Sequence, residues 1–241
     1  MFPFAEARLN VVEDVLSIYA GITGGLQRKG FDLLAEQNPF IQSVLPLQYT
    51  RERFVFYAGA AARAGKHINL YASFRTGVIG NEAFFVNDFS QAPFSRFIPI
   101  YDDANLIAGR FEAEYHTAER VKIKAFAAFE KWNMQHELQP WHKPATTLGA
   151  EAYYNLGNKV IARAAVTASG KQYARLEDED GEVRAYRIKG YTDISLGLEY
   201  RYTRQLSAFL NLNNVTGVRA YKWYNYPGYR FNVLGGIAYS F

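Results

Sequence analysis

Four histidines are the side chains of this sequence with the widest chemical repertoire, as metal ligands or as acid–base catalysts. His136 and His142 lie in one polar segment with Glu137, while His67 and His116 stand apart. A zinc site needs three or four ligands at defined spacings, and a solvated loop explains the segment with His136 and His142 more simply. We therefore expect no metal, no cofactor and no enzymatic activity.

Two acidic clusters could attract Ca²⁺, because carboxylate oxygens are its preferred ligands. They are the pair Asp102 and Asp103 and the acidic run at residues 177–180. Neither has the spacing of an EF-hand loop. An acidic connection between strands stays soluble without any ion, and we expect that role for the run.

A further set of charged residues alternates with apolar residues along extended segments. Val121 and Ile123, for example, alternate with Lys122 and Lys124. A β-strand places successive side chains on opposite faces, so the pattern predicts strands with one apolar and one charged face. The residues expected to face a polar lumen are Lys122, Lys124, Arg163, Glu151, Asp193, Glu199 and Arg201. Either these residues line a channel or contact a plug, or they pair with one another and only keep the wall solvated.

Segments with this alternation recur along the whole chain. We predict about eleven strands, each at or above the roughly 9 to 11 residues that a tilted strand needs to cross a bilayer. They cover residues 2–10, 16–29, 49–63, 67–85, 97–115, 120–133, 144–154, 159–173, 184–202, 205–223 and 229–241. Strands of soluble domains usually have only about 5 to 6 residues. Strand length therefore favours an all-β, antiparallel transmembrane β-barrel over a soluble sandwich.

The composition agrees with a barrel and excludes two other classes of protein. Aromatic residues make up 16% of the chain, while the mean hydropathy is only −0.21. No apolar run approaches the about 18 residues of a transmembrane helix, which excludes a helical membrane protein. The net charge of +4 is spread along the chain without a basic block, so we expect no nucleic-acid partner.

The connections between the predicted strands alternate in length. The short ones cover 11–14, 64–66, 116–119, 155–158 and 203–204, and the long ones 30–48, 86–96, 134–143, 174–183 and 224–228. Short turns at one end and long loops at the other are typical of bacterial outer-membrane barrels, with the short turns in the periplasm. Aromatic residues near both ends would form interfacial belts. The candidates for these belts are Trp132, Trp141, Trp223, Tyr200 and Tyr202.

The last segment of the chain alternates up to an aromatic final residue, with Ile237, Tyr239 and Phe241 on one face. It resembles the terminal strand of bacterial outer-membrane β-barrels. The resemblance implies that these three residues form the signal read by the barrel-assembly machinery.

The preceding residues resemble one particular family of such barrels. The segment Asn211-Leu212-Asn213-Asn214, the later Tyr226-Pro227-Gly228 turn and the aromatic-ended strand follow in the same order in the C-terminal barrel region of TonB-dependent receptors. Residues 30–40 are similar to receptor-like barrels of Bacteroidetes. The resemblance implies an integral protein of the bacterial outer membrane.

The resemblance implies that residues 1–241 are a single domain that is the C-terminal part of a barrel of about 22 strands. The odd strand count supports this, because a single-chain barrel with both ends in the periplasm needs an even number. The first residues lack the features of a signal peptide, and the chain matches neither a plug domain nor an energy-coupling box. We therefore expect further sequence upstream.

Two functions remain open. The first is outer-membrane transport, as a porin or as a TonB-dependent-receptor-like transporter of a nutrient such as a chelate, a glycan or a peptide. Its implied partners are TonB, the barrel-assembly machinery, outer-membrane lipid, lipopolysaccharide and a surface lipoprotein. The alternative is a structural barrel whose loops bind a surface lipoprotein or a secretion-system component.

Overall fold

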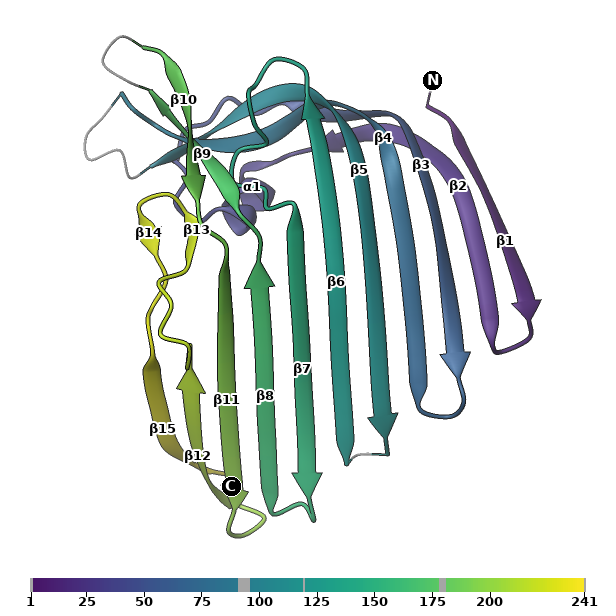
Figure 1. Ribbon diagram of the computed structural model, residues 1–241, viewed down its shortest axis with the longest axis vertical. Coiled ribbons are helices and arrows are strands. Elements are labelled where there is room, and N and C mark those ends of the chain that lie inside the picture. The colour runs from purple at the N-terminus through teal and green to yellow at the C-terminus, as the bar shows by residue number, and fades with distance from the viewer. Residues whose placement is uncertain (1, 91–95, 119, 178–180, 241) are drawn as a thin grey trace.

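The computed structural model describes residues 2–90, 96–118, 120–177 and 181–240 as a curved wall of strands with connections at both ends (Figure 1). Eleven strands form one antiparallel sheet in the order β1-β2-β3-β4-β5-β6-β7-β8-β11-β12-β15. Their bounds are β1 Phe4–Val12, β2 Leu16–Arg28, β3 Tyr49–Ala64, β4 Ile68–Asn87, β5 Phe97–Thr117, β6 Val121–Met134, β7 Thr146–Leu156, β8 Val160–Ser169, β11 Tyr191–Arg201, β12 Leu206–Asn213 and β15 Asn232–Tyr239. The predicted all-β antiparallel fold with an eleven-stranded wall is confirmed.

The sheet does not close on itself. Among the described residues, β1 pairs with β2 alone and β15 pairs with β12 alone. These two strands are the edges of the wall, and they lie at its opposite sides in Figure 1.

The register of the sheet sorts its side chains onto two faces. Tyr57 of β3 lies opposite Arg75 of β4, Arg75 lies opposite Ala108 of β5, and Ala108 lies opposite Glu130 of β6. We call the face that carries these four residues the inner face, and the opposite one the outer face.

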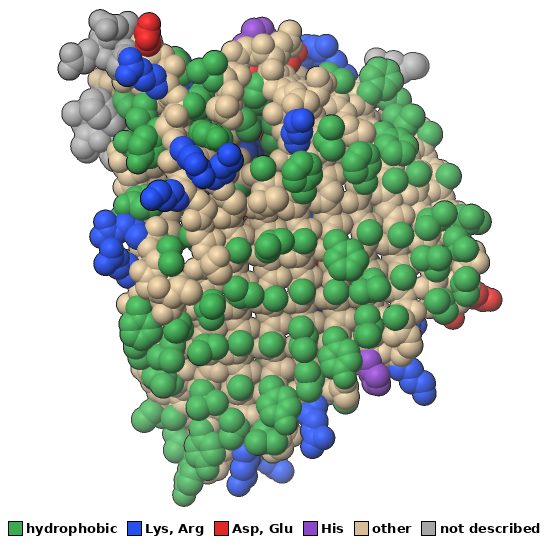
Figure 2. Space-filling model, in the orientation of Figure 1, with side chains coloured by type: hydrophobic (Ala, Val, Ile, Leu, Met, Phe, Trp, Pro, Cys, Tyr) green, Lys and Arg blue, Asp and Glu red, His purple; other side chains and the backbone are tan. Residues whose placement is uncertain are grey.

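The outer face exposes large apolar side chains. Phe56, Phe74, Ile123, Leu196 and Leu198 are each between 41% and 48% exposed. Figure 2 shows rows of hydrophobic side chains across the strands, with charged side chains gathered near the two ends of the wall. Proteins in water rarely expose a contiguous apolar area of this extent, and a band of this kind suits the hydrocarbon of a bilayer.

The short connections lie together at the lower end of the wall in Figure 1. Asp14, Gly65 and Asn158 adopt positive φ angles of 58°, 68° and 57° there. Left-handed backbone is least costly for Gly, Asn and Asp, so the local sequence determines these tight turns.

Three of the predicted strands are too long. The predicted strand 159–173 is interrupted after Ser169, and β9 (Gln172–Glu177) instead pairs with β10 (Val183–Ile188), which takes the start of the predicted strand 184–202. The backbone crosses closely here, since a Cβ on Gly190 would lie 2.5 Å from the Ser169 carbonyl oxygen. The predicted strand 205–223 likewise divides into β12 and β13 (Tyr221–Trp223), and β13 pairs with β14 (Tyr226–Pro227).

A short helix, α1 (Phe31–Gln37), occupies part of the long connection 30–48, for which no regular structure was predicted. Leu34 is fully buried, and Asp32 lies in the first turn, where a negative charge is favourable to the helix dipole. No helix within the described ranges is long and apolar enough to cross a membrane.

The strands β4 and β5 extend beyond the rest of the wall. Their register shifts between Ile79 and Glu82, where Asn81 has a φ of 53° and its N–H donates to the Asp103 carboxylate at 2.9 Å. Beyond this bulge the two strands lean toward β9 (Figure 1), which β4 contacts. We call this extension, residues 82–87 and 97–102, the arm.

Candidate functional site

The long connections pack into one body, which we call the loop cluster: α1, the arm, the loop 135–143, the β9–β10 hairpin and the β13–β14 pair. Leu34, Phe97 and Trp223 meet at its centre and are 0%, 0% and 7% exposed, together with buried Ala83 and Phe85. The Phe97 and Trp223 ring centroids are 5.4 Å apart. The loop cluster therefore contains an apolar core of its own.

A second core lies on the opposite face of the arm. Phe84, Val86 and Trp141 are buried there, and the ring of Trp132 packs edge-on against Phe84 with centroids 5.7 Å apart. Apolar packing on both faces fixes the arm across the long-loop end of the wall.

His142 joins three segments of the loop cluster. Its Nδ1–H donates to the Phe85 carbonyl at 2.9 Å, and the Tyr224 N–H donates to its Nε2 at 3.2 Å. The ring packs against those of Phe97 and Trp223, with centroids 5.3 and 5.2 Å away. Burial among these groups lowers the pKa of His142 to about 4, so the neutral tautomer with hydrogen on Nδ1 persists at neutral pH.

Asp102 fixes the start of the loop 135–143. Its carboxylate is 3% exposed and accepts the N–H groups of His136 and Glu137 at 3.0 and 2.9 Å, and it also contacts the His136 ring at 2.7 Å. Its neighbour Asp103 pairs with Arg53 at 3.1 Å. Both carboxylates of the candidate Ca²⁺ pair thus bind protein groups. Of the acidic run 177–180, only Glu177 is among the described residues, and it pairs with Arg175 at 3.0 Å.

A cavity of about 500 Å³ opens on the inner face next to the loop cluster. Tyr57, Glu52 and Arg110 line it from the wall, and Gln37 of α1 reaches it from the loop cluster. The Glu52 carboxylate accepts hydrogen bonds from Gln27 at 2.6 Å and from Arg75.

A second carboxylate of this cavity, Glu82, lies between two lysines. Its oxygens are 3.7 Å from Lys29 Nζ and 3.8 Å from Lys143 Nζ, and Glu82 itself is only 7% exposed. Lys143 also lies 5.2 Å from the centre of the Trp132 ring. The cavity therefore offers polar side chains whose charges are already paired, beside half-buried aromatic rings.

A second hollow of about 600 Å³ lies lower on the inner face, between β6 and β12. It brings together Lys122, Lys124, Glu151 and Arg163 of the predicted lumen-facing set. Lys124 pairs with Glu114 at 2.7 Å.

The remaining predicted lumen-facing residues, Asp193, Glu199 and Arg201, share this face through the register of β11. Glu199 binds Arg163 at 3.3 Å and Arg201 at 2.9 Å. Asp193 accepts a hydrogen bond from Ser195 at 3.3 Å. Mutual pairing therefore accounts for part of the set, and a role in a channel stays a proposal.

The candidate aromatic belt divides into two groups. Tyr200 and Tyr202 lie at the short-turn end and are 46% and 68% exposed. Trp141 and Trp223, in contrast, are 1% and 7% exposed inside the loop cluster, and Trp132 lines the inner cavity. The long loops thus bury Trp141 and Trp223, and the register of β6 places Trp132 on the inner face.

The residues of the proposed assembly signal lie at the end of β15. Ile237 and Tyr239 are 76% and 57% exposed and lie opposite Ala208 and Leu206. Phe241 lies outside the described residues. Recognition by an assembly machinery stays a prediction.

Sequence reasoning missed most of the cavity. Glu52, Arg75 and Glu82 carry no recognisable motif, although strict alternation along β4, where Arg75 follows the outer-face Phe74, would have found Arg75. Glu52 was hidden by the register shift between Glu52 and Phe54, which breaks the alternation of β3.

Known proteins resemble this chain in fold, but none of the sequence comparisons finds a match. No protein-family model matches the chain, and no curated protein matches it. The pyoverdine outer membrane receptor FpvA from Pseudomonas aeruginosa PAO1, solved bound to pyoverdine, superimposes with a TM-score of 0.73 at 15% identity over 100% of this chain and 36% of that one.

Two further solved structures are similar. The ferric-catecholate import receptor Fiu from K12 E. coli matches with a TM-score of 0.67 at 14% identity, over 98% of this chain and 34% of that one. The iron transporter FrpB from Neisseria meningitidis matches with a TM-score of 0.67 at 15% identity, over 99% and 38%. The chain thus spans between 34% and 38% of the length of these three structures. Its fold is that of the barrel of TonB-dependent outer-membrane receptors.

Proposed function

We propose that this chain is part of the barrel of a TonB-dependent-receptor-like transporter of the bacterial outer membrane, and that the transporter imports a small polar nutrient. The observation that carries the proposal is the cavity on the inner face beside the loop cluster, in a wall whose outer face is apolar. An iron chelate is the first cargo to test, because the similar structures include iron importers. TonB, the barrel-assembly machinery and a surface lipoprotein are the partners that this function implies.

The cavity suits a ligand that is captured and released repeatedly. Glu52 and Glu82 are already paired with Arg75, Lys29 and Lys143. A ligand would therefore not need to neutralise either of these two carboxylates. Binding then depends on hydrogen bonds and aromatic contact, which are weaker than a fully desolvated ion pair. A ligand of this cavity would therefore bind without being trapped.

We also propose that further strands complete the barrel. In an antiparallel sheet of eleven strands, β1 and β15 run in the same direction, so their direct pairing would be parallel. An odd number of additional strands restores antiparallel pairing at both edges. An open edge in lipid leaves backbone groups unsatisfied, at several kcal/mol for each group.

The proposal that further strands lie between β1 and β15 can be tested with introduced cysteines, because the chain has none of its own. Cysteines in place of Leu9 and Ile237, near the short-turn ends of β1 and β15, should not form a disulfide under oxidation in the membrane. Cross-linking of this pair would show that the two edges are neighbours and would overturn the proposal of intervening strands.

The transport proposal is tested by filling the cavity without changing its charges. Ala128 lines the cavity, while its neighbour Ala127 lies on the outer face. In a strain that lacks the chromosomal gene, Ala128→Trp should reduce uptake of labelled ferric chelates while Ala127→Trp does not, at equal amounts in the outer membrane. Normal uptake of every chelate by the gene-deletion strain would refute iron import and favour the scaffold function.

A further inference from the structure

Six basic side chains gather at the long-loop end of β8, β11 and β15, and we call them the basic surface. They are Lys171, Arg187, Lys189, Arg219, Lys222 and Arg230, and all six are exposed. Figure 2 shows Lys and Arg side chains gathered at the upper left of the apolar face, directly above its hydrophobic rows. Residues 214–231 contribute three of the cations and contain no Asp or Glu.

Backbone and side-chain contacts hold these residues close to one another. Arg187 lies opposite Tyr173 in the β9–β10 register, and Lys171 Nζ lies 6.0 Å from the centre of the Tyr173 ring. The buried Gln172 amide donates to the carbonyl oxygens of Tyr221 and Lys222 at 3.0 and 2.8 Å. The hairpin and the β13–β14 pair therefore present their cations side by side.

A buried asparagine brings two more of the cations, Arg219 and Arg230, close together. The Asn214 side-chain amide donates to the Val218 carbonyl at 2.7 Å and to the Tyr229 carbonyl at 2.9 Å, and Asn214 is 3% exposed. These carbonyls directly precede Arg219 and Arg230. The two arginines are thus held on a fixed backbone.

The acidic side chains that the structure describes do not neutralise this surface. Among the described residues, none of the six cations has a carboxylate within 4.0 Å, whereas the nearby Arg175 and Arg184 pair with Glu177 and Glu182. Six cations on one surface repel one another, so a partner with negative charge is favoured.

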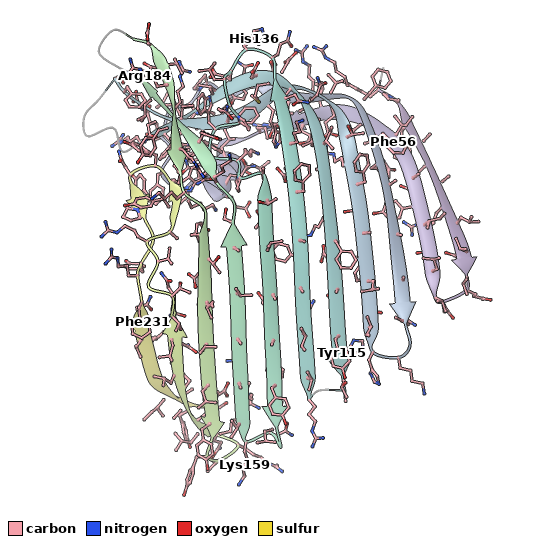
Figure 3. All side chains as sticks on the ribbon, viewed as in Figure 1. Phe56, Tyr115, His136, Lys159, Arg184 and Phe231 are labelled. Atoms are coloured by element: carbon pink, nitrogen blue, oxygen red, sulfur yellow. The ribbon has the colours of Figure 1, made fainter. Side chains whose placement is uncertain are left out.

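Exposed aromatic and apolar side chains accompany the cations. Tyr229, Phe231 and Tyr186 are 89%, 52% and 49% exposed. Phe231 lies at the long-loop end of β15, and Arg184 marks the hairpin above it (Figure 3). Aromatic rings and cations next to an apolar band are typical of the headgroup level of a membrane. A dissolved anion would not require this apolar neighbourhood.

We propose that the basic surface binds the phosphate groups of a lipid in the leaflet at the long-loop end, as lipid A of lipopolysaccharide would supply. Arg219, Lys222 and Arg230 would contact the phosphates, while Phe231 and Tyr229 contact the adjoining acyl and sugar groups. The inference rests on the proposed placement in the outer membrane.

The test compares retention of lipid A by the purified natural protein and by a variant with Arg219→Gln, Lys222→Gln and Arg230→Gln. Proteins are exchanged into phosphatidylcholine nanodiscs that contain lipid A, and bound lipid is counted by native mass spectrometry. Each cation near a membrane surface contributes about fivefold in affinity. The triple variant should therefore bind lipid A on the order of a hundredfold more weakly.

The matched control removes the same charge from the other end of the wall, with Lys66→Gln, Lys159→Gln and Arg204→Gln. It should retain lipid A like the natural protein, and replacing Arg219 and Arg230 by Lys should do the same. Equal loss in the two Gln triples, or no loss in either, would overturn the proposal. Displacement of lipid A by inorganic phosphate alone would also overturn it, because the surface would then be a free-anion site.

The experiment separates this inference from the proposed function. Absence of the natural protein from the outer-membrane fraction would remove the premise of both. Recovery there, with retention of lipid A unaffected by the triple substitution, would refute the lipid site alone.

Discussion

Acidification should loosen the loop cluster through His142. The pKa of this ring is lowered to about 4 by burial, whereas an unfolded or opened chain titrates near its ordinary value of about 6.5. As the pH falls, the closed state loses stability wherever the open state binds more protons than the closed one. The contribution of neutral His142 is therefore complete above about pH 6.5 and is lost progressively as the pH falls toward about 4.

The size of the effect follows from these two values. At about pH 5 the open state is stabilised by about 2 kcal/mol, which raises its population about thirtyfold. Hydrogen–deuterium exchange of residues 221–227 measures this opening, after correction for the pH dependence of intrinsic exchange. The Tyr224 N–H should report it directly, since it donates to His142 Nε2.

The variant His142→Asn supplies the control. His142 has a φ of 56°, which Asn tolerates well, and the Asn amide can still donate to the Phe85 carbonyl. The variant should open more readily at neutral pH by about 1 to 2 kcal/mol, and the extra opening near pH 5 should disappear. If wild type and variant respond to pH identically, titration of His142 does not control the loop cluster.

Three further predictions concern the wall and its ends. Leu196→Lys on the outer face should cost about 2 to 4 kcal/mol in unfolding free energy in lipid, and an unchanged urea midpoint would argue against lipid contact. Asn225→Cys should react with a membrane-impermeant maleimide on intact cells while Lys66→Cys reacts only after permeabilisation, and the reverse result would invert the topology. Gly149→Ala should cost about 1 to 3 kcal/mol, because its Cβ would lie 2.3 Å from the Phe126 ring; stability equal to wild type would show that the ring can move aside.

The wall was predictable from the sequence because the patterns that specify it, side-chain alternation and turn residues, are local. Alternation of side chains decides the face of every residue between bulges, and residues such as Asn158 and Gly65 mark the tight turns. The eleven strands therefore appear in the sequence nearly where the structure has them.

The loop cluster was not predictable in the same way. Tryptophan is a typical residue of membrane interfaces, so the sequence alone places Trp141 and Trp223 there. They are buried because they pack against the arm, and this contact depends on the tertiary structure. No local sequence pattern predicts the bulge at Asn81, where the arm begins. Alternation past the Glu52–Phe54 shift likewise assigns residues to the wrong face until the partner strand is known.

The His142 contacts also imply an order of events during folding. Its bonds reach Phe85 and Tyr224, which are 57 and 82 residues away along the chain. Contacts at such separations close large loops and are intrinsically slow to form, whereas hairpins with short turns form from neighbouring residues. The wall should therefore assemble first and the loop cluster last. Substitutions at His142 would then accelerate unfolding while leaving the rate of wall assembly nearly unchanged.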